Sequence, residues 1–197
     1  MMKQKAVAID LDRTLCNLNT FNIYIKYLLQ EYSIHPLLFS ELIIWIIARK
    51  LRIVSHASFK YHILSRFTPV SEKTLEKLVE KIYINRNQLV CDILEKSKQN
   101  NLFTILATAA PEAYAKDIAQ RFGFDFCVAT PNPEKGKEWY ETRGIIKRDH
   151  VIQLSEKHSF IIDLAISDHD DDTPLLRAAT NALLVNTKNN ELINYKN

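Results

Sequence analysis

Two carboxylates, Asp10 and Asp12, stand one residue apart directly after a short apolar run at residues 6–9. The run is unbroken and consists of Ala, Val and Ile, which is typical of a parallel strand buried on both faces. Ligands of open α/β sheets bind beyond the carboxyl ends of such strands, so both aspartates are expected at the rim of a pocket. Because side chains two residues apart in a strand point to the same side, both carboxylates can address one substrate or one cation. A helix N-cap role would explain only one of them.

Length and composition predict a globular protein. The chain has 197 residues, of which 47% are hydrophobic, enough for one core with a smaller inserted subdomain. Its 26 basic and 23 acidic residues nearly balance, so no nucleic-acid partner is expected. Cys16, Cys91 and Cys127 are widely spaced and lack a CxxC pairing, and no hydrophobic signal segment follows Met1. These features favour a cytoplasmic location.

Two further junctions between a strand and a helix carry candidate phosphate ligands. Thr108 closes the apolar run 102–108 and precedes a predicted helix at 112–119 with Pro111 in its first turn. A hydroxyl group near a helix N-terminus favours an anion, although a plain N-cap role is the alternative. Lys147 follows Gly144 ahead of a predicted helix, where its ammonium could reach a phosphate. Another run, 124–130, is predicted to be a strand with a structural role only.

The segment 168–172 contains four aspartates in five positions, directly after the apolar run 160–167. Carboxylates this close repel one another unless a positive charge lies among them. Asp172 could cap a helix that begins near Pro174, but capping does not explain Asp168, which ends its strand as Asp10 does. A hard cation such as Mg²⁺ would fit two acidic strand ends that meet in space.

The order of these motifs resembles that of the haloacid dehalogenase superfamily of phosphohydrolases, in its phosphoserine phosphatase-like branch. Residues 10–14 match the family's DxDxT motif, Thr108 its hydroxyl motif, Gly144 to Lys147 its GxxK setting, and 168–172 its acidic motif. The resemblance implies an α/β fold: a three-layer Rossmann-like core with a parallel sheet, plus an inserted all-helical cap.

The resemblance also implies the role of each site residue. Asp10 would attack phosphorus to give an aspartyl-phosphate, and Asp12 would act as general acid and then as general base. Thr108 and Lys147 would hold the phosphate oxygens. Mg²⁺ would be bound by Asp10, by the Asp12 backbone carbonyl and by Asp168. Asp172 would be a further metal ligand or would orient the metal's waters.

Some positions depart from the family pattern or compete for a role. Arg13 stands where many of these phosphatases have glycine. Lys135 and Lys137 are rivals of Lys147, and Asp171 is a rival of Asp172.

The stretch between the first two motifs is too long for a simple connection and has helical patterns. We expect residues 1–15 and 87–197 to form the core and 16–86 to form the cap, with helices near 21–32, 36–51, 55–67 and 71–84.

One cap segment, residues 37–48, is apolar around nearly its full circumference but too short to span a bilayer. It must be buried in the cap, against a partner, or at a membrane surface, and burial in the cap is the favoured interpretation. For a membrane surface, the basic residues Arg49, Lys50, Arg52 and Lys60 would assist.

The leading hypothesis is a Mg²⁺-dependent phosphomonoester hydrolase acting on a small or lipid-like phosphorylated metabolite. The alternative is a phosphatase or phosphotransferase module of a membrane-lipid or cell-envelope pathway that needs a membrane or protein partner. A non-catalytic binding module is the third hypothesis. Neither the substrate nor the oligomeric state follows from the sequence.

Overall fold

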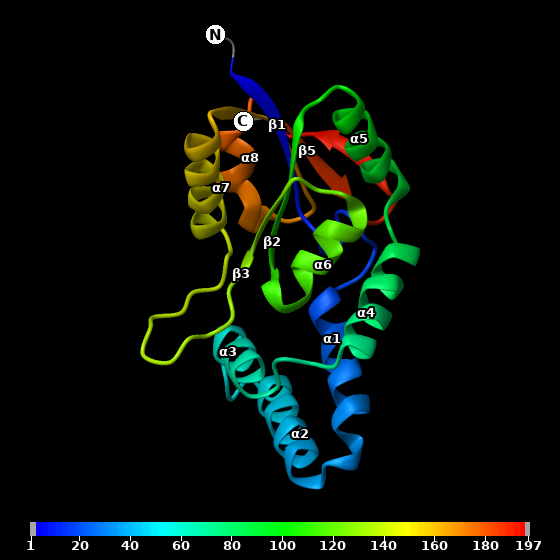
Figure 1. Cartoon of the computed structure of the whole chain (residues 1–197), viewed down its shortest axis with the longest axis vertical. Coiled ribbons are helices and arrows are strands. Elements are labelled where there is room, and N and C mark those ends of the chain that lie inside the picture. The colour runs from blue at the N-terminus through cyan, green and yellow to red at the C-terminus, as the bar shows by residue number, and fades with distance from the viewer. Residues whose placement is uncertain (1–2, 196–197) are drawn as a thin grey trace.

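The core of the protein is one six-stranded sheet with helices on both faces, as the computed structural model of residues 3–195 shows (Figure 1). The strands are β1 (Gln4–Ile9), β2 (Phe103–Pro111), β3 (Phe126–Thr130), β4 (Phe160–Ser167), β5 (Asn181–Asn186) and β6 (Glu191–Asn194). Their order is β3-β2-β1-β4-β5-β6, and β1 to β5 are parallel. The predicted α/β core is therefore confirmed. The edge strand β6 departs from the predicted parallel sheet, because it pairs antiparallel with β5.

Strand β1 lies in the middle of this sheet and is covered on both sides. Ala6 and Ala8 pack with α7 (Ile145–His158) and α8 (Thr173–Ala178). Val7 and Ile9 point the other way, into the cluster formed with α5 (Gln88–Gln99) and α6 (Glu112–Phe122). Figure 1 shows the two helix layers on opposite sides of the sheet. The run of β1 is unbroken and apolar because helices cover both faces of the strand, as predicted from the sequence.

Four helices form the segment between β1 and α5: α1 (Thr20–Glu31), α2 (Pro36–Lys50), α3 (His56–Arg66) and α4 (Glu72–Ile84). They lie together at the lower end of the molecule in Figure 1. Their bounds agree with the predicted ranges to within one residue. Two of the helix starts are set by serine caps, because the Ser55 and Ser71 hydroxyls accept backbone N–H groups at 3.0 Å and 3.3 Å. The division of the chain at residues 15/16 and 86/87 stays a prediction.

The helical segment is anchored to the core by a shared apolar cluster. Leu28 of α1 and Leu78 and Ile82 of α4 are fully buried in the same cluster as Tyr114 of α6. The ring of Tyr24 lies 5.2 Å from that of Tyr114. This packing holds the cap helices over the carboxyl ends of the central strands.

Helix α2 does not have the burial that the sequence favours. Within it only Leu42 is buried, whereas Leu37, Ile44 and Ile47 are exposed. The favoured interpretation of residues 37–48 as cap interior therefore holds for one side of the helix, with Leu42 and Trp45, and fails for the other. The physical reason is that α2 packs mainly against α3 and the short 3₁₀ turn Tyr32–Ile34, which leaves one side of the helix exposed.

Among residues 3–195, no helix combines the length and the apolar content that crossing a membrane requires.

The apolar cluster between cap and core predicts a sharp contrast between two isoleucines of α4. Ile82 is fully buried, whereas Ile84 is 65% exposed. Ile82→Ala should lower the free energy of unfolding by about 2–5 kcal/mol, because it leaves a cavity. Ile84→Ala should change it by less than about 0.5 kcal/mol. Urea unfolding followed by circular dichroism measures both, and equal losses would contradict the described packing.

Candidate active site

The six site residues predicted from the sequence line one cavity of about 370 Å³ between the core and the cap helices. They are Asp10, Asp12, Thr108, Lys147, Asp168 and Asp172. The cavity lies at the carboxyl ends of the neighbouring strands β2, β1 and β4, where ligands of such sheets bind. The parallel register places Ile9 of β1 beside Ile166 of β4, so Asp10 and Asp168 leave the sheet close together.

The chain turns sharply after β1, and this turn presents both aspartates of the first motif. The Leu15 amide donates to the Asp10 carbonyl at 3.2 Å, which closes the turn. The Thr20 amide, in the first turn of α1, donates to Asp12 Oδ1 at 2.8 Å and fixes that carboxylate. Arg13 has φ of 58°, in the left-handed region that favours glycine, and lines the cavity. The departure from glycine at this position therefore costs backbone strain and adds a cation to the rim.

Lys147 makes a fully buried set of polar contacts in the site, and the residue is 2% exposed. Its Nζ donates to Asp10 Oδ1 at 2.8 Å and to Asp172 Oδ2 at 2.8 Å. The Ser167 hydroxyl donates to the same Asp172 oxygen at 2.6 Å. Asp172 therefore holds the ammonium of Lys147 against Asp10. Sequence reasoning missed Ser167, although a hydroxyl residue that ends a strand next to the acidic motif was a usable signal.

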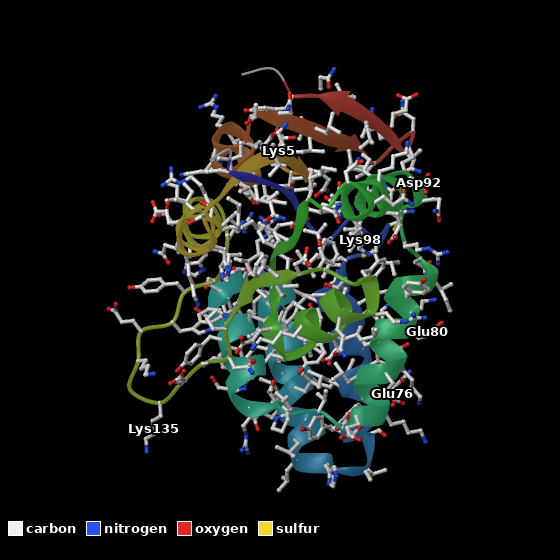
Figure 2. All side chains as sticks on the ribbon, turned by 45° about the horizontal axis from the view of Figure 1, so that its top comes forward. Lys5, Glu76, Glu80, Asp92, Lys98 and Lys135 are labelled. Atoms are coloured by element: carbon white, nitrogen blue, oxygen red, sulfur yellow. The ribbon has the colours of Figure 1, made fainter. Side chains whose placement is uncertain are left out.

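The rival lysines lie elsewhere. Figure 2 shows Lys135 at the outer end of the loop between β3 and α7, with its side chain directed away from the molecule. Lys137 lies in the same loop and pairs with Glu134. Of the three lysines, only Lys147 lines the cavity.

The two rival aspartates have different partners. Asp171 accepts a hydrogen bond from Arg143 Nε at 2.6 Å and is partly exposed. Asp172 is buried and faces Lys147. The structure thus brings Asp172, and not Asp171, into contact with the Lys147 ammonium.

Thr108 is buried within β2 and does not cap a helix. Its Oγ1 accepts the Ala110 amide at 3.0 Å, while the N-cap of α6 is Pro111. The N-cap alternative for Thr108 is therefore wrong. The Thr130 hydroxyl of β3 donates to the Ala109 carbonyl at 2.6 Å, so the last residues of β2 after Thr108 are fixed from the neighbouring strand.

Lys60 of α3 contacts the same end of β2 from the cap. It is 3% exposed, donates to the Ala109 carbonyl at 3.1 Å, and forms an ion pair with Glu141 of the loop before α7. Burial lowers the pKa of Lys60, and the charge of Glu141 opposes that effect. The sequence analysis grouped Lys60 with the basic residues of a membrane surface, and its burial shows that this was wrong. Glu141 was missed because no sequence pattern marked it.

Burial also controls the acidity of the carboxylates in the cavity. It raises the pKa of Asp10 to about 7, against the opposing charge of Lys147. Burial likewise raises the pKa values of Asp12 and Asp168. For Lys147, burial lowers the pKa, but the carboxylates of Asp10 and Asp172 outweigh it, so the pKa is above its usual value. Burial thus disfavours the ionised carboxylates, and a cation bound between Asp10 and Asp168 would stabilise their charged form.

A larger hollow of about 690 Å³ lies between α4 and α6. Four carboxylates and one guanidinium line it, from Glu72, Glu76, Glu80, Asp117 and Arg121. Figure 2 shows Glu76 and Glu80 on the outer side of α4. Such a surface repels an anion, so the smaller cavity is the better candidate for a phosphate site.

Comparison with known families identifies the class of protein. The family model of haloacid dehalogenase-like hydrolases matches residues 7–177. The match covers most of the chain and includes all six predicted site residues, so the chain belongs to this family of hydrolases. The predicted family, and with it the prediction of an enzyme, is confirmed. Comparison with curated proteins gave no match.

Solved structures of similar fold include phosphoserine phosphatases. A protein of unknown function from Bordetella pertussis Tohama I has a TM-score of 0.68 at 19% identity, over 92% of this chain and 89% of that one. A probable phosphoserine phosphatase from Vibrio cholerae has a TM-score of 0.64 at 12% identity, over 90% of this chain and 55% of that one. A substrate-bound phosphoserine phosphatase has a TM-score of 0.58 at 13% identity, over 92% of this chain and 85% of that one. This chain thus spans about half of the Vibrio cholerae protein, and these likenesses show the fold.

The buried pair of Lys60 and Glu141 predicts coupled effects on stability. Lys60→Met or Glu141→Gln alone should lower the free energy of unfolding by about 1–3 kcal/mol, because each leaves a poorly solvated partner. The double variant should lose less than the sum of the two single losses. The exposed pair of Lys137 and Glu134 is the control, and its coupling should stay below about 0.5 kcal/mol. Additive losses at Lys60 and Glu141 in chemical denaturation would show that the pair contributes nothing.

Proposed function

We propose that this protein is a Mg²⁺-dependent phosphomonoester hydrolase that works through an aspartyl-phosphate on Asp10. The observation that carries the proposal is the contact of the Lys147 ammonium with Asp10 Oδ1, at 2.8 Å, inside the cavity that Asp12, Thr108 and Asp168 also line. A carboxylate nucleophile and the cation that would bind a phosphate oxygen thus lie side by side. Family membership supports hydrolysis, and the two named phosphoserine phosphatases share the fold.

In this proposal Asp10 attacks phosphorus in line and forms the phosphoenzyme, while the leaving group departs as an alcohol. Lys147 and the Thr108 hydroxyl bind the equatorial oxygens, where negative charge must be accommodated. Asp172 and Ser167 keep Lys147 in place through the contacts described above. The end of β2 is held from β3 by Thr130, which contacts Ala109, so Thr108 is fixed before the substrate arrives.

Asp12 would protonate the leaving oxygen and then take a proton from the water that hydrolyses the phosphoenzyme. The Thr20 amide holds Asp12 Oδ1 at 2.8 Å, which keeps the carboxylate at the cavity wall beside Asp10. Both proton transfers need the same carboxyl group at the same place, and the contact with the start of α1 supplies that constraint.

The oxygen donors of the cavity fit a magnesium ion. The carboxylates of Asp10 and Asp168 and the backbone carbonyl of Asp12 are hard donors, and the nearest side-chain partner of Asp168 is the Thr14 hydroxyl at 3.5 Å. A few oxygen donors suffice for Mg²⁺, because the ion keeps waters and phosphate oxygens as further ligands. When bound, Mg²⁺ reduces the repulsion between a carboxylate and a phosphate. We assign Asp172 the role of orienting the metal's waters, not that of a direct ligand, because its carboxylate already accepts hydrogen bonds from Lys147 and Ser167.

The part of the cavity beyond the phosphate site favours a small polar leaving group. Arg49, His56, Lys60, Glu141 and Arg143 line it, and an acyl chain placed there would desolvate these charges. A small phosphorylated metabolite is therefore the preferred substrate class.

The second candidate is a phosphatase or phosphotransferase module of a membrane-lipid or cell-envelope pathway, and the exposed apolar side of α2 favours it. In either case we retain a cytoplasmic location as a proposal, which the three free cysteines support.

The test of this function is hydrolysis of p-nitrophenyl phosphate. Turnover should require Mg²⁺, disappear in EDTA and return when Mg²⁺ is added in excess. Asp10→Asn should abolish it, because an amide is a poor nucleophile, while circular dichroism stays unchanged. Turnover that persists in EDTA would refute the metal assignment. A folded wild-type chain without turnover on this ester or on a panel of phosphorylated metabolites would favour a non-catalytic binding module.

A second prediction concerns the lysine of the third motif. Lys147→Ala should lower kcat by about 10²-fold or more, since it removes a cation from the transferring phosphoryl group. Lys135→Ala is the matched control and should leave kcat unchanged, because Lys135 lies on the outer loop (Figure 2). Steady-state kinetics, with unfolding curves for both variants, measure the contrast. A large loss at Lys135 with normal rates at Lys147 would reverse the assignment.

A further inference from the structure

Exposed large apolar side chains gather on α2 and its two flanks. Six of the thirteen found in residues 3–195 lie within the twenty residues 34–53. Leu37, Ile44, Ile47 and Leu51 follow helical spacing, so they form one face, with exposed fractions of 84%, 63%, 49% and 66%. Ile34 and Ile53 extend it at either end. We call these six residues the α2 face.

The opposite side of α2 already has its partners. Leu42 is fully buried, and the Trp45 ring stacks on His62 of α3 with 3.9 Å between ring centroids. Glu41 also faces α3, where it pairs with His62 at 3.1 Å and with Arg66 at 3.2 Å. Helix α2 is therefore held by α3, and the α2 face is left over after the cap has folded.

Within residues 34–53, the charged side chains that flank the α2 face are cationic. Glu41 is the one carboxylate in residues 34–53, and the guanidinium of Arg66 neutralises it. Lys50 and Arg52 are exposed beside Leu51 and Ile53. An apolar face bordered by lysine and arginine is the pattern of helices that lie in the interface of an anionic membrane.

We propose that the α2 face docks on the surface of an anionic lipid membrane. A helix of fifteen residues is about 22 Å long and would lie in the plane of the headgroups with its apolar face toward the acyl chains. A second copy of the chain is a poorer partner. In a two-fold interface the same patch would have to supply anionic partners for Lys50 and Arg52 of the other copy, and its one carboxylate, Glu41, is already paired with α3.

Docking in this way has a consequence for the cavity. Arg49, in the last turn of α2, lines the active-site cavity, while Lys50 and Leu51 next to it belong to the docking side. Arg49 and Leu51 are two residues apart and therefore lie on opposite sides of the helix, so a docked α2 would lie between the cavity and the lipid headgroups.

Sedimentation of the full chain with lipid vesicles tests the docking. The protein should pellet with vesicles that contain phosphatidylglycerol and remain in solution with phosphatidylcholine alone, and pelleting should weaken as salt rises. Replacing Ile44 and Ile47 together by aspartate should lower the partition coefficient by about tenfold or more. Lys50→Glu should lower it by about fivefold or more.

Two matched controls separate the α2 face from a general effect of charge or hydrophobicity. Ile84→Asp changes an isoleucine of similar exposure on α4, and Lys96→Glu changes an exposed lysine on α5. Both should pellet like the parent chain. Asp10→Asn should also pellet normally, so the docking stands or falls independently of phosphatase activity.

Three results would overturn the docking proposal. The first is a chain that stays in solution with phosphatidylglycerol vesicles, and the second is an equal loss of pelleting in Ile84→Asp. The third is a dimer in analytical ultracentrifugation that the Ile44 and Ile47 double variant dissociates, since the α2 face would then belong to a second copy.

Discussion

The site depends on one buried ammonium held between two carboxylates. Lys147 contacts Asp10 and Asp172, and 137 positions of sequence separate it from Asp10. A buried ammonium is stable only with anionic partners, and two buried carboxylates this close need a cation. The contact therefore joins the turn after β1, the first turn of α7 and the 3₁₀ turn Asp170–Asp172. The ammonium of Lys147 stabilises the two buried carboxylates, and the carboxylates stabilise the buried ammonium.

The sequence predicts elements well where the signal is local. Runs of apolar residues identified β1 and β4, and cap serines accompanied α3 and α4. Helix α5 was missed, although Asn87 caps it and Val90, Cys91 and Leu94 follow helical spacing. Strands β5 and β6 gave a weaker signal. Most residues of β6 are exposed and its pairing with β5 is antiparallel, so neither alternation nor an apolar run marks it.

The six candidate site residues were predictable because parallel strands end at one edge of a sheet. Their supporting residues were not. Lys60 stands in α3 next to the buried Phe59, and sequence alone does not tell which polar residue of such a helix turns inward. Likewise, an apolar composition around all of α2 does not reveal how many neighbours the helix has. Both depend on how the cap helices meet the core, which is a property of the tertiary structure.

The carbonyl oxygen of Ala109 accepts one hydrogen bond from the core, through Thr130, and one from the cap, through Lys60. It lies one residue beyond Thr108. Any movement of α3 away from the sheet must break the second bond and leave this oxygen with one donor. Contact of α3 with the core and the conformation of β2 at Thr108 are therefore energetically coupled. Because such coupling is reciprocal, a phosphate bound at Thr108 would favour the position of the cap in which Lys60 contacts Ala109.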